Sequence, residues 1–178
     1  MRKLSKKNIK IGILGGTFDP PHKGHLHISK IALRKLKLNK LIWAITKKNP
    51  LKKKPYLKIK TRIKLSKKIT SKDKKIFINC FDDKIKSVNT FDLLNHIKKK
   101  QKGTELYFLI GADNLVKFHK WKNWKKIPKL AKLAVFPRDN YLLGKSKYIV
   151  SKTLKKNDLI YINSKKVNIS SSLIRKFW

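Results

Sequence analysis

Short apolar runs alternate along this chain with segments whose apolar residues recur at helical spacing, and this alternation constrains the fold more than any other feature. The short runs predict buried strands at residues 9–14, 41–45, 76–81, 106–110, 133–136 and 159–162. Helical spacing predicts helices at residues 24–37, 60–71 and 90–100, two short helices within 114–132, and a final helix from Ser171 to the end. The alternation predicts an α/β fold with a doubly wound, mostly parallel sheet.

The 178 residues predict one domain that spans residues 1–178. This length suits a single core, and neither an internal repeat nor a linker interrupts the pattern. In a doubly wound sheet, ligands bind at the carboxyl ends of the strands. The loops after Leu14, Ile45, Ile110 and the last strand are therefore the first candidates for a binding site.

The charge is strongly unbalanced, with 48 Lys and Arg against nine Asp and Glu and a formal net charge of +39. Such a chain attracts polyanions, so a nucleic-acid-binding protein on a Rossmann-like scaffold is one candidate. Only five of the 48 basic residues are arginine, however, and the lysines are spread along the whole chain. Because arginine reads guanine edges and grips phosphate bidentately, this composition favours a general drift toward lysine. We expect no specific nucleic-acid partner.

Membrane, secreted and cysteine-rich classes are disfavoured. No apolar run reaches the roughly 18 residues that a membrane span requires. No secretion signal follows the basic residues 1–7. The single cysteine, Cys80, excludes an internal disulfide and a cysteine-based zinc cluster, and its position in an expected strand predicts a core residue. We expect a cytoplasmic protein without membrane attachment.

The loop after the first strand carries the densest set of candidate functional residues. Gly15 and Gly16 are expected to end the strand in a turn where a ligand can approach the backbone closely. The N-terminus of the following helix presents N–H groups and a positive dipole end, which suit phosphate. His22 and His25 are three residues apart and can point at the same anion. Asp19 is expected to brace its own proline-containing turn, and the glycine spacing fits neither the GxGxxG fingerprint nor a Walker A loop.

Two motifs resemble the nucleotidyltransferase superfamily. Residues 15–25 resemble its GxFDPxHxGH signature, and residues 169–175 resemble its ISSTxxR motif, with Ser172 in place of threonine. The resemblance implies a Rossmann-like nucleotidyltransferase topology and ATP as a substrate, with His22, His25 and Arg175 acting on the phosphates in the transition state. The other residues that it implies in ATP or phosphate binding are Gly15, Gly16, Thr17, Phe18, Lys23, Gly111, Asp113, Ser170, Ser171 and Ser172.

The middle of the chain resembles the bacterial nicotinate-nucleotide adenylyltransferases within this superfamily. Residues 111–115 resemble their GxDxL segment, residues 118–121 their FxxW segment, and residues 87–93 their SxTxDTL segment with one insertion. The resemblance implies adenylyl transfer from ATP to nicotinate mononucleotide (NaMN), giving deamido-NAD and pyrophosphate. Because the mononucleotide phosphate is already an anionic nucleophile, direct in-line attack needs positioning and charge neutralisation rather than a general base.

The same resemblance implies roles on the acceptor side. Trp121 would stack on the pyridine ring, Thr90 and backbone N–H groups near Trp121 would meet its carboxylate, and Lys52 would meet the mononucleotide phosphate. Asp113 would meet ribose hydroxyls, or cap a helix, or both. Mg²⁺ is expected as a cofactor held mainly by the ATP phosphates, without a metal site on the protein.

Other acceptors are the alternatives within the superfamily, namely nicotinamide mononucleotide (NMN) and phosphopantetheine. N–H and hydroxyl donors favour a carboxylate over an amide, because the amide turns an NH₂ donor toward them. These residues therefore predict NaMN as the preferred acceptor.

Overall fold

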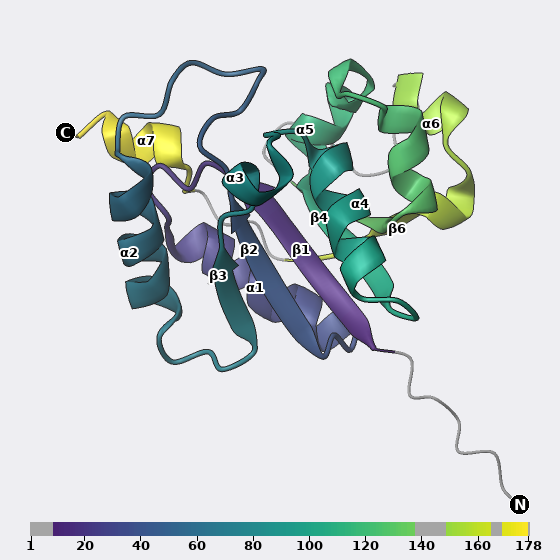
Figure 1. Ribbon diagram of the computed structural model, residues 1–178, viewed down its shortest axis with the longest axis horizontal. Helices are drawn as coiled ribbons and strands as arrows, with labels where there is room; N and C mark the ends of the chain where they lie inside the picture. The colour runs from purple at the N-terminus through teal and green to yellow at the C-terminus, as the bar shows by residue number, and fades with distance from the viewer. Residues whose placement is uncertain (1–8, 138–148, 165–168, 178) are drawn as a thin grey trace, which may run out of the picture.

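The computed structural model describes residues 9–137, 149–164 and 169–177. Its six described strands are all parallel and form one sheet in the order β3-β2-β1-β4-β5-β6 (Figure 1). The order confirms the predicted doubly wound topology, in which the chain winds outward from β1 on one side and from β4 on the other. The strands are β1 (Lys10–Gly16), β2 (Lys40–Ile45), β3 (Ile76–Asn79), β4 (Glu105–Gly111), β5 (Lys132–Phe136) and β6 (Leu159–Tyr161).

Helices cover both faces of the sheet, because successive strand residues are apolar on both sides. Trp43 and Leu109 face α1 and α2, whereas Ile13 and Phe108 face α4, α5 and α6. The helices are α1 (Lys23–Lys35), α2 (Ile59–Thr70), α3 (Asp82–Ile85), α4 (Thr90–Lys100), α5 (Ala112–Val116), α6 (Ile149–Thr153) and α7 (Ser171–Arg175), with 3₁₀ turns η1 (Phe118–Lys120), η2 (Trp124–Lys129) and η3 (Lys156–Asp158).

The two glycines that were expected to end β1 in a turn instead belong to the strand. Gly15 pairs with Ala44 and Gly16 with Ile45 in the parallel ladder with β2. A Cβ on Gly15 would lie 3.2 Å from the Phe108 ring, so the glycine allows β1 to continue past this side chain. The loop therefore begins after Gly16, at Thr17.

The third strand is shorter than predicted. It ends at Asn79, and Phe81 becomes the N-cap residue of α3, a short helix that the apolar pattern did not reveal. Cys80 consequently lies outside the strand and is only partly buried, which corrects its expected core position. The early end of β3 matters because α3 and the segment after it border the site described below.

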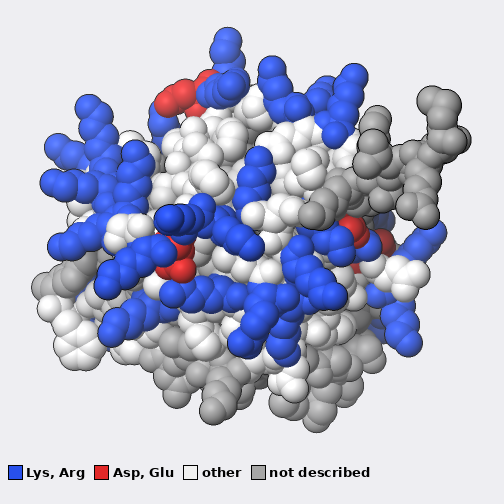
Figure 2. Space-filling view, turned by 90° about the horizontal axis from the view of Figure 1, so that it is seen from below, with Lys and Arg blue, Asp and Glu red and all other residues white. Residues whose placement is uncertain are grey.

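Lysine and arginine side chains are spread over the surface rather than gathered in one stripe. Figure 2 shows them across the visible face, with Asp and Glu in only a few places. In the described part of the chain, ion pairs such as Lys132–Glu105 and Lys122–Asp92 involve the scarce acids. With nine Asp and Glu for 48 Lys and Arg, most of the basic residues therefore have no acidic partner available.

Candidate active site

The two histidines of the first motif lie together at the N-terminus of α1. His22 is the N-cap residue and His25 is the third residue of the helix, and their ring centroids are 3.8 Å apart. The backbone N–H of His22 donates to Nδ1 of His25 at 3.2 Å. Because this nitrogen accepts, the proton of a neutral His25 ring resides on Nε2. In that form the ring N–H of His25 lies on the edge away from the His22 backbone. His22 itself is only 5% exposed.

Gly24 brings the two distant motifs into contact. A Cβ at this position would lie 2.9 Å from Nδ1 of His22 and 2.9 Å from Cγ2 of Ile169. Only a residue without a side chain allows the start of the second motif to pack so closely on the first. The sequence-distant segments thus form one site.

The second motif attaches α7 to the first loop. Ser170 caps the helix by accepting from the Leu173 N–H at 3.1 Å, and the Ser171 hydroxyl donates to the Pro20 carbonyl at 2.8 Å. Arg175 donates to the Asp19 carbonyl and lies 3.8 Å from its carboxylate. It also donates to the Ser172 hydroxyl at 3.2 Å. Arg175 therefore helps to hold the loop that carries the histidines.

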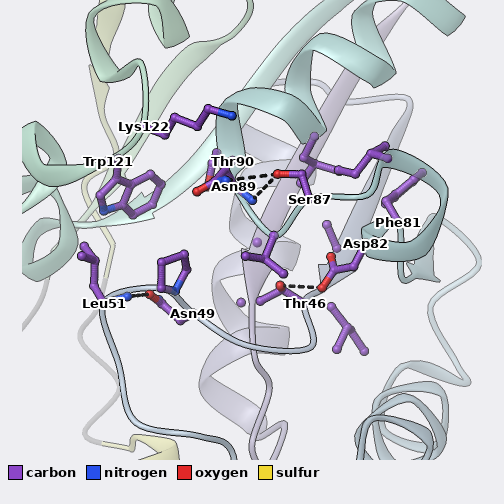
Figure 3. A pocket seen from close by; sticks show the side chains of 18 of the residues that line it. Thr46, Asn49, Leu51, Phe81, Asp82, Ser87, Asn89, Thr90, Trp121 and Lys122 are labelled. Carbon is purple, nitrogen blue, oxygen red and sulfur yellow. Dashed lines mark hydrogen bonds between the residues drawn. The ribbon is translucent and has the colours of Figure 1, made fainter.

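A pocket opens beside the carboxyl ends of β1 and β2, on the face covered by α4. In Figure 3, Trp121 and Leu51 lie at one end of it and Phe81 and Asp82 at the other. Trp121 packs edge-on against Phe108, with ring centroids 5.9 Å apart, and this contact fixes the indole at the wall. The lining also includes Gly15, Gly16, Asn49, Pro50, Ser87, Val88, Asn89, Thr90, Lys120 and Lys122.

Hydrogen bonds hold the segment that leads to Thr90. Ser87 donates to the Asp92 carboxylate at 2.6 Å, and Lys122 donates to the same oxygen at 3.1 Å. Burial raises the pKa of Asp92, but the hydrogen bonds from Ser87 and Lys122 outweigh it, so the pKa lies below its ordinary value. Asp92 therefore remains a carboxylate that connects the start of α4 to the Trp121 segment.

Four residues expected at the site line the pocket: Gly15, Gly16, Thr90 and Trp121. Lys52 does not; it is exposed, and its neighbours Asn49, Pro50 and Leu51 form that wall instead. The Pro-rich loop turns there, with the Lys52 N–H donating to the Asn49 carbonyl at 3.1 Å.

The remaining predicted residues lie around the first loop and the end of β4. Phe18 is buried, with its ring stacked on that of Trp43 at 4.8 Å and 4.7 Å from that of His25, so its side chain is not open to a ligand. Lys23 is exposed in the first turn of α1. Gly111 is the N-cap residue of α5, and Asp113 lies in the first turn, so Asp113 is not itself the cap.

The sequence predicted that Asp19 braces its own turn, but the structure shows a different role. Its carboxylate accepts from the backbone N–H groups of Tyr56 at 2.8 Å and Leu57 at 2.9 Å, across the site. The expectation was wrong because a tertiary contact competes with the local turn.

Arg62 is a site residue that sequence reasoning missed. It is only 2% exposed on α2, and its guanidinium donates to four backbone carbonyls in the loops around the site. Burial lowers the pKa of Arg62, and the nearby Asp19 carboxylate opposes this shift. The available signal was rarity: Arg62 is one of five arginines in a chain where lysine prevails.

Comparison with known proteins agrees with the family that the two motifs indicate. The cytidylyltransferase-like family model matches residues 13–177, which defines the class of this chain. A relative from Pelagibacter ubique, named a probable nicotinate-nucleotide adenylyltransferase, is 50% identical over 173 residues that cover 97% of this chain and 96% of the relative. A relative of the same name from Aquifex aeolicus is 32% identical over 164 residues, covering 90% of this chain and 98% of the relative. The chain belongs to the nicotinate-nucleotide adenylyltransferase family.

A solved structure shares the fold. The Plasmodium falciparum nicotinic acid mononucleotide adenylyltransferase complexed with NaAD superposes with a TM-score of 0.77 at 23% identity, covering 96% of this chain and 84% of that chain. None of the helices in the described residues is long and apolar enough to cross a membrane.

Proposed function

We propose that this chain transfers the adenylyl group of ATP to NaMN, giving deamido-NAD and pyrophosphate. The observation that carries the proposal is the position of the Trp121 pocket, which shares Gly15 and Gly16 with the strand that leads into the histidine loop. An acceptor in this pocket would place its phosphate near the phosphate-binding N-terminus of α1. Names of curated relatives across the whole chain support the same reaction.

The reaction requires no covalent intermediate on the protein. An oxygen of the mononucleotide phosphate forms a bond to the α-phosphorus of ATP, and the bond to the β-phosphate oxygen breaks as pyrophosphate leaves. Negative charge gathers on the α-phosphate and the leaving group, so the protein must supply donors and hold the reactants in line. We assign to His22 and His25 the stabilisation of this negative charge, because both lie at the N-terminus of α1.

Further ATP contacts are assigned by position. Residues 17–22 connect β1 to α1 and are called the phosphate loop below. Lys23 and the backbone of Gly15, Gly16, Thr17 and Phe18 lie in this loop or next to its ends. Gly111 is the last residue of β4, and Asp113, two residues later, would meet ribose. The second motif, Ser170, Ser171, Ser172 and Arg175, would hold the pyrophosphate half. Arg175 keeps further N–H donors beyond those used on Asp19 and Ser172.

The acceptor is assigned to the pocket. Trp121 would stack on the pyridine ring, and Thr90 with the nearby backbone N–H groups would bind the carboxylate. Lys52 would reach the mononucleotide phosphate from its exposed position in the loop beside Asn49.

We further propose that ATP enters as its Mg²⁺ complex, in a cytoplasmic setting. Imidazole and N–H donors dominate the phosphate loop, whereas Mg²⁺ prefers oxygen ligands, so the phosphates would carry the ion. Within the described residues, no group of three or more His, Cys, Asp or Glu side chains is placed to hold a metal.

The test is pyrophosphate release from ATP with NaMN, NMN or phosphopantetheine as the acceptor. We expect at least an approximately hundredfold preference for NaMN over NMN in kcat/KM, since a charge-assisted hydrogen bond contributes about 1.5–3 kcal/mol and an unmet donor costs about 1–3 kcal/mol. Thr90→Ala should reduce this preference more than it slows the NaMN reaction, and Thr61→Ala, at an exposed position of α2, is the matched control. Equal kcat/KM values for NaMN and NMN would contradict the assignment of the acceptor.

A further inference from the structure

Arg62 connects two loops that belong to opposite sides of the candidate site. Its Nη1 donates to the carbonyl of Thr17 at 2.5 Å and to that of Thr46 at 2.7 Å. Its Nη2 donates to the carbonyl of Lys47 at 3.1 Å, and its Nε to that of Leu57 at 3.0 Å. Every one of these acceptors is a neutral backbone group, so the guanidinium fixes chain positions rather than another side chain.

Three of the four carbonyls mark the two ends of one loop, residues 46–57. At the first end, Asp82 also accepts from the Thr46 hydroxyl at 2.9 Å and from the Lys47 N–H at 2.6 Å. At the second end, Asp19 accepts from the N–H groups of Tyr56 and Leu57. Between these fixed ends, the loop places Asn49, Pro50 and Leu51 on the pocket wall.

The fourth carbonyl belongs to the loop that carries the first motif. Thr17 directly follows β1 and precedes Phe18, whose ring packs on His25. One planar, buried group therefore spans the phosphate loop and the pocket wall, and a displacement of either loop would change the hydrogen bonds to the other.

We propose that Arg62 is a positioning residue that couples binding of ATP to binding of the acceptor. When ATP binds, it orders the phosphate loop. The hydrogen bonds from Arg62 to Thr17 and Thr46 pass this order to the pocket wall that receives the acceptor. The coupling rests on the proposed function of the two subsites, and linkage requires it to be reciprocal.

Lysine at this position would preserve the charge but not the connection. The planar guanidinium has five N–H donors in a fixed fork, whereas an ammonium has three on a single nitrogen and cannot hold the same four carbonyls in both loops. Arg62→Lys therefore tests whether coupling depends on the hydrogen bonds of the guanidinium or only on its positive charge.

The experiment is calorimetric titration of NaMN with and without saturating α,β-methylene-ATP, whose bridging carbon blocks transfer, and the reciprocal titration. For the wild type we expect the analogue to tighten NaMN binding at least about fivefold, the lower end of ordinary coupling. For Arg62→Lys the ratio should approach one, and kcat should fall about a hundredfold through misplacement of the reactants. Arg34→Lys, at an exposed position of α1, is the matched control and should keep the wild-type ratio.

A wild-type ratio of one would overturn the coupling, as would a wild-type ratio in a folded Arg62→Lys. If Arg62→Lys does not fold, as judged by circular dichroism, Asp82→Asn tests the same connection at the Thr46 end. It should lower the ratio at least about twofold while Arg62 is intact, and an unchanged ratio would also overturn the proposal. Pyrophosphate release by the wild type tests the proposed function separately, since an active enzyme without coupling would refute only the role of Arg62.

Discussion

At the scale of single residues, the role that we propose for His25 depends on how its ring is oriented. The His22 N–H occupies Nδ1 of His25, and the Phe18 ring, stacked on buried Trp43, packs against the imidazole. Both contacts limit rotation of the ring. A preorganised donor of this kind needs no reorganisation when charge develops on a phosphate.

Replacing either His22 or His25 with alanine should therefore lower kcat by roughly 10²–10³-fold, the cost of losing one preorganised donor. The measurement is steady-state pyrophosphate release, with His96→Ala, a histidine of α4 outside the pocket lining, as the control. An increase confined to KM would mean that the histidines only bind the substrate, because a transition-state role must appear in kcat.

At the scale of elements, the site depends on close packing between α1 and the segment that enters α7. Gly24 lies between the His22 ring and Ile169, and Ser171 and Arg175 bind the backbone of residues 19–20. α7 itself is short and is attached largely by these contacts, so a change at Gly24 acts on both motifs.

We predict that Gly24→Ala destabilises the fold by about 1–3 kcal/mol, the usual cost of an inserted methyl group in a well-packed region. It should also reduce kcat/KM, because the methyl group pushes the His22 ring and Ile169 apart. Chemical denaturation measures the first effect. The control is Gly16→Ala, whose Cβ would meet its nearest neighbour at an ordinary 3.5 Å. Equal free energies of unfolding for the two variants would contradict the prediction, because they would show that Ile169 and α7 shift away from the added methyl group without loss of stability.

At the scale of the whole molecule, the sheet shows how the chain is organised, and the distribution of charges shows where acidic and basic residues are used. All six described strands join one sheet with a core on each face, and we propose that the chain is a single domain. Three of the nine acidic residues, Asp19, Asp82 and Asp92, hold loops that border the pocket. These three acidic residues thus lie where a loop needs an acceptor, while the lysines and arginines on the face shown in Figure 2 are spread across it.

This distribution predicts nucleic-acid binding that is weak and independent of sequence. In a filter-binding salt series, unrelated duplexes should bind equally, and six to ten phosphate contacts would lose about 10³–10⁵ in affinity between 50 and 200 mM salt. Transfer activity at saturating substrates, measured over the same series, is the control. A duplex bound about 10³-fold more tightly than the others would support a specific nucleic-acid function instead.

The sequence by itself determined the order of the strands and of the longer helices, and the two motifs, because apolar periodicity and local chemistry act over short distances. It did not reveal the short helices α3 and α6. It predicted Thr90 and Trp121 at one pocket, since both lie in segments that resemble a known family. It misplaced the end of β1, because pairing of Gly15 with Ala44 depends on a neighbouring strand.

Only the tertiary structure decided which distant groups meet. The backbone N–H groups bound by the Asp19 carboxylate are 37 and 38 residues away, and the carbonyls held by Arg62 come from two separate loops. Lys52 stays outside the pocket that its neighbours line. Backbone carbonyls and N–H groups are the same at every position of a chain, so no residue pattern identifies which of them a buried guanidinium or carboxylate will bind. Folding selects them, because a buried charge is tolerated only where enough polar groups converge on it.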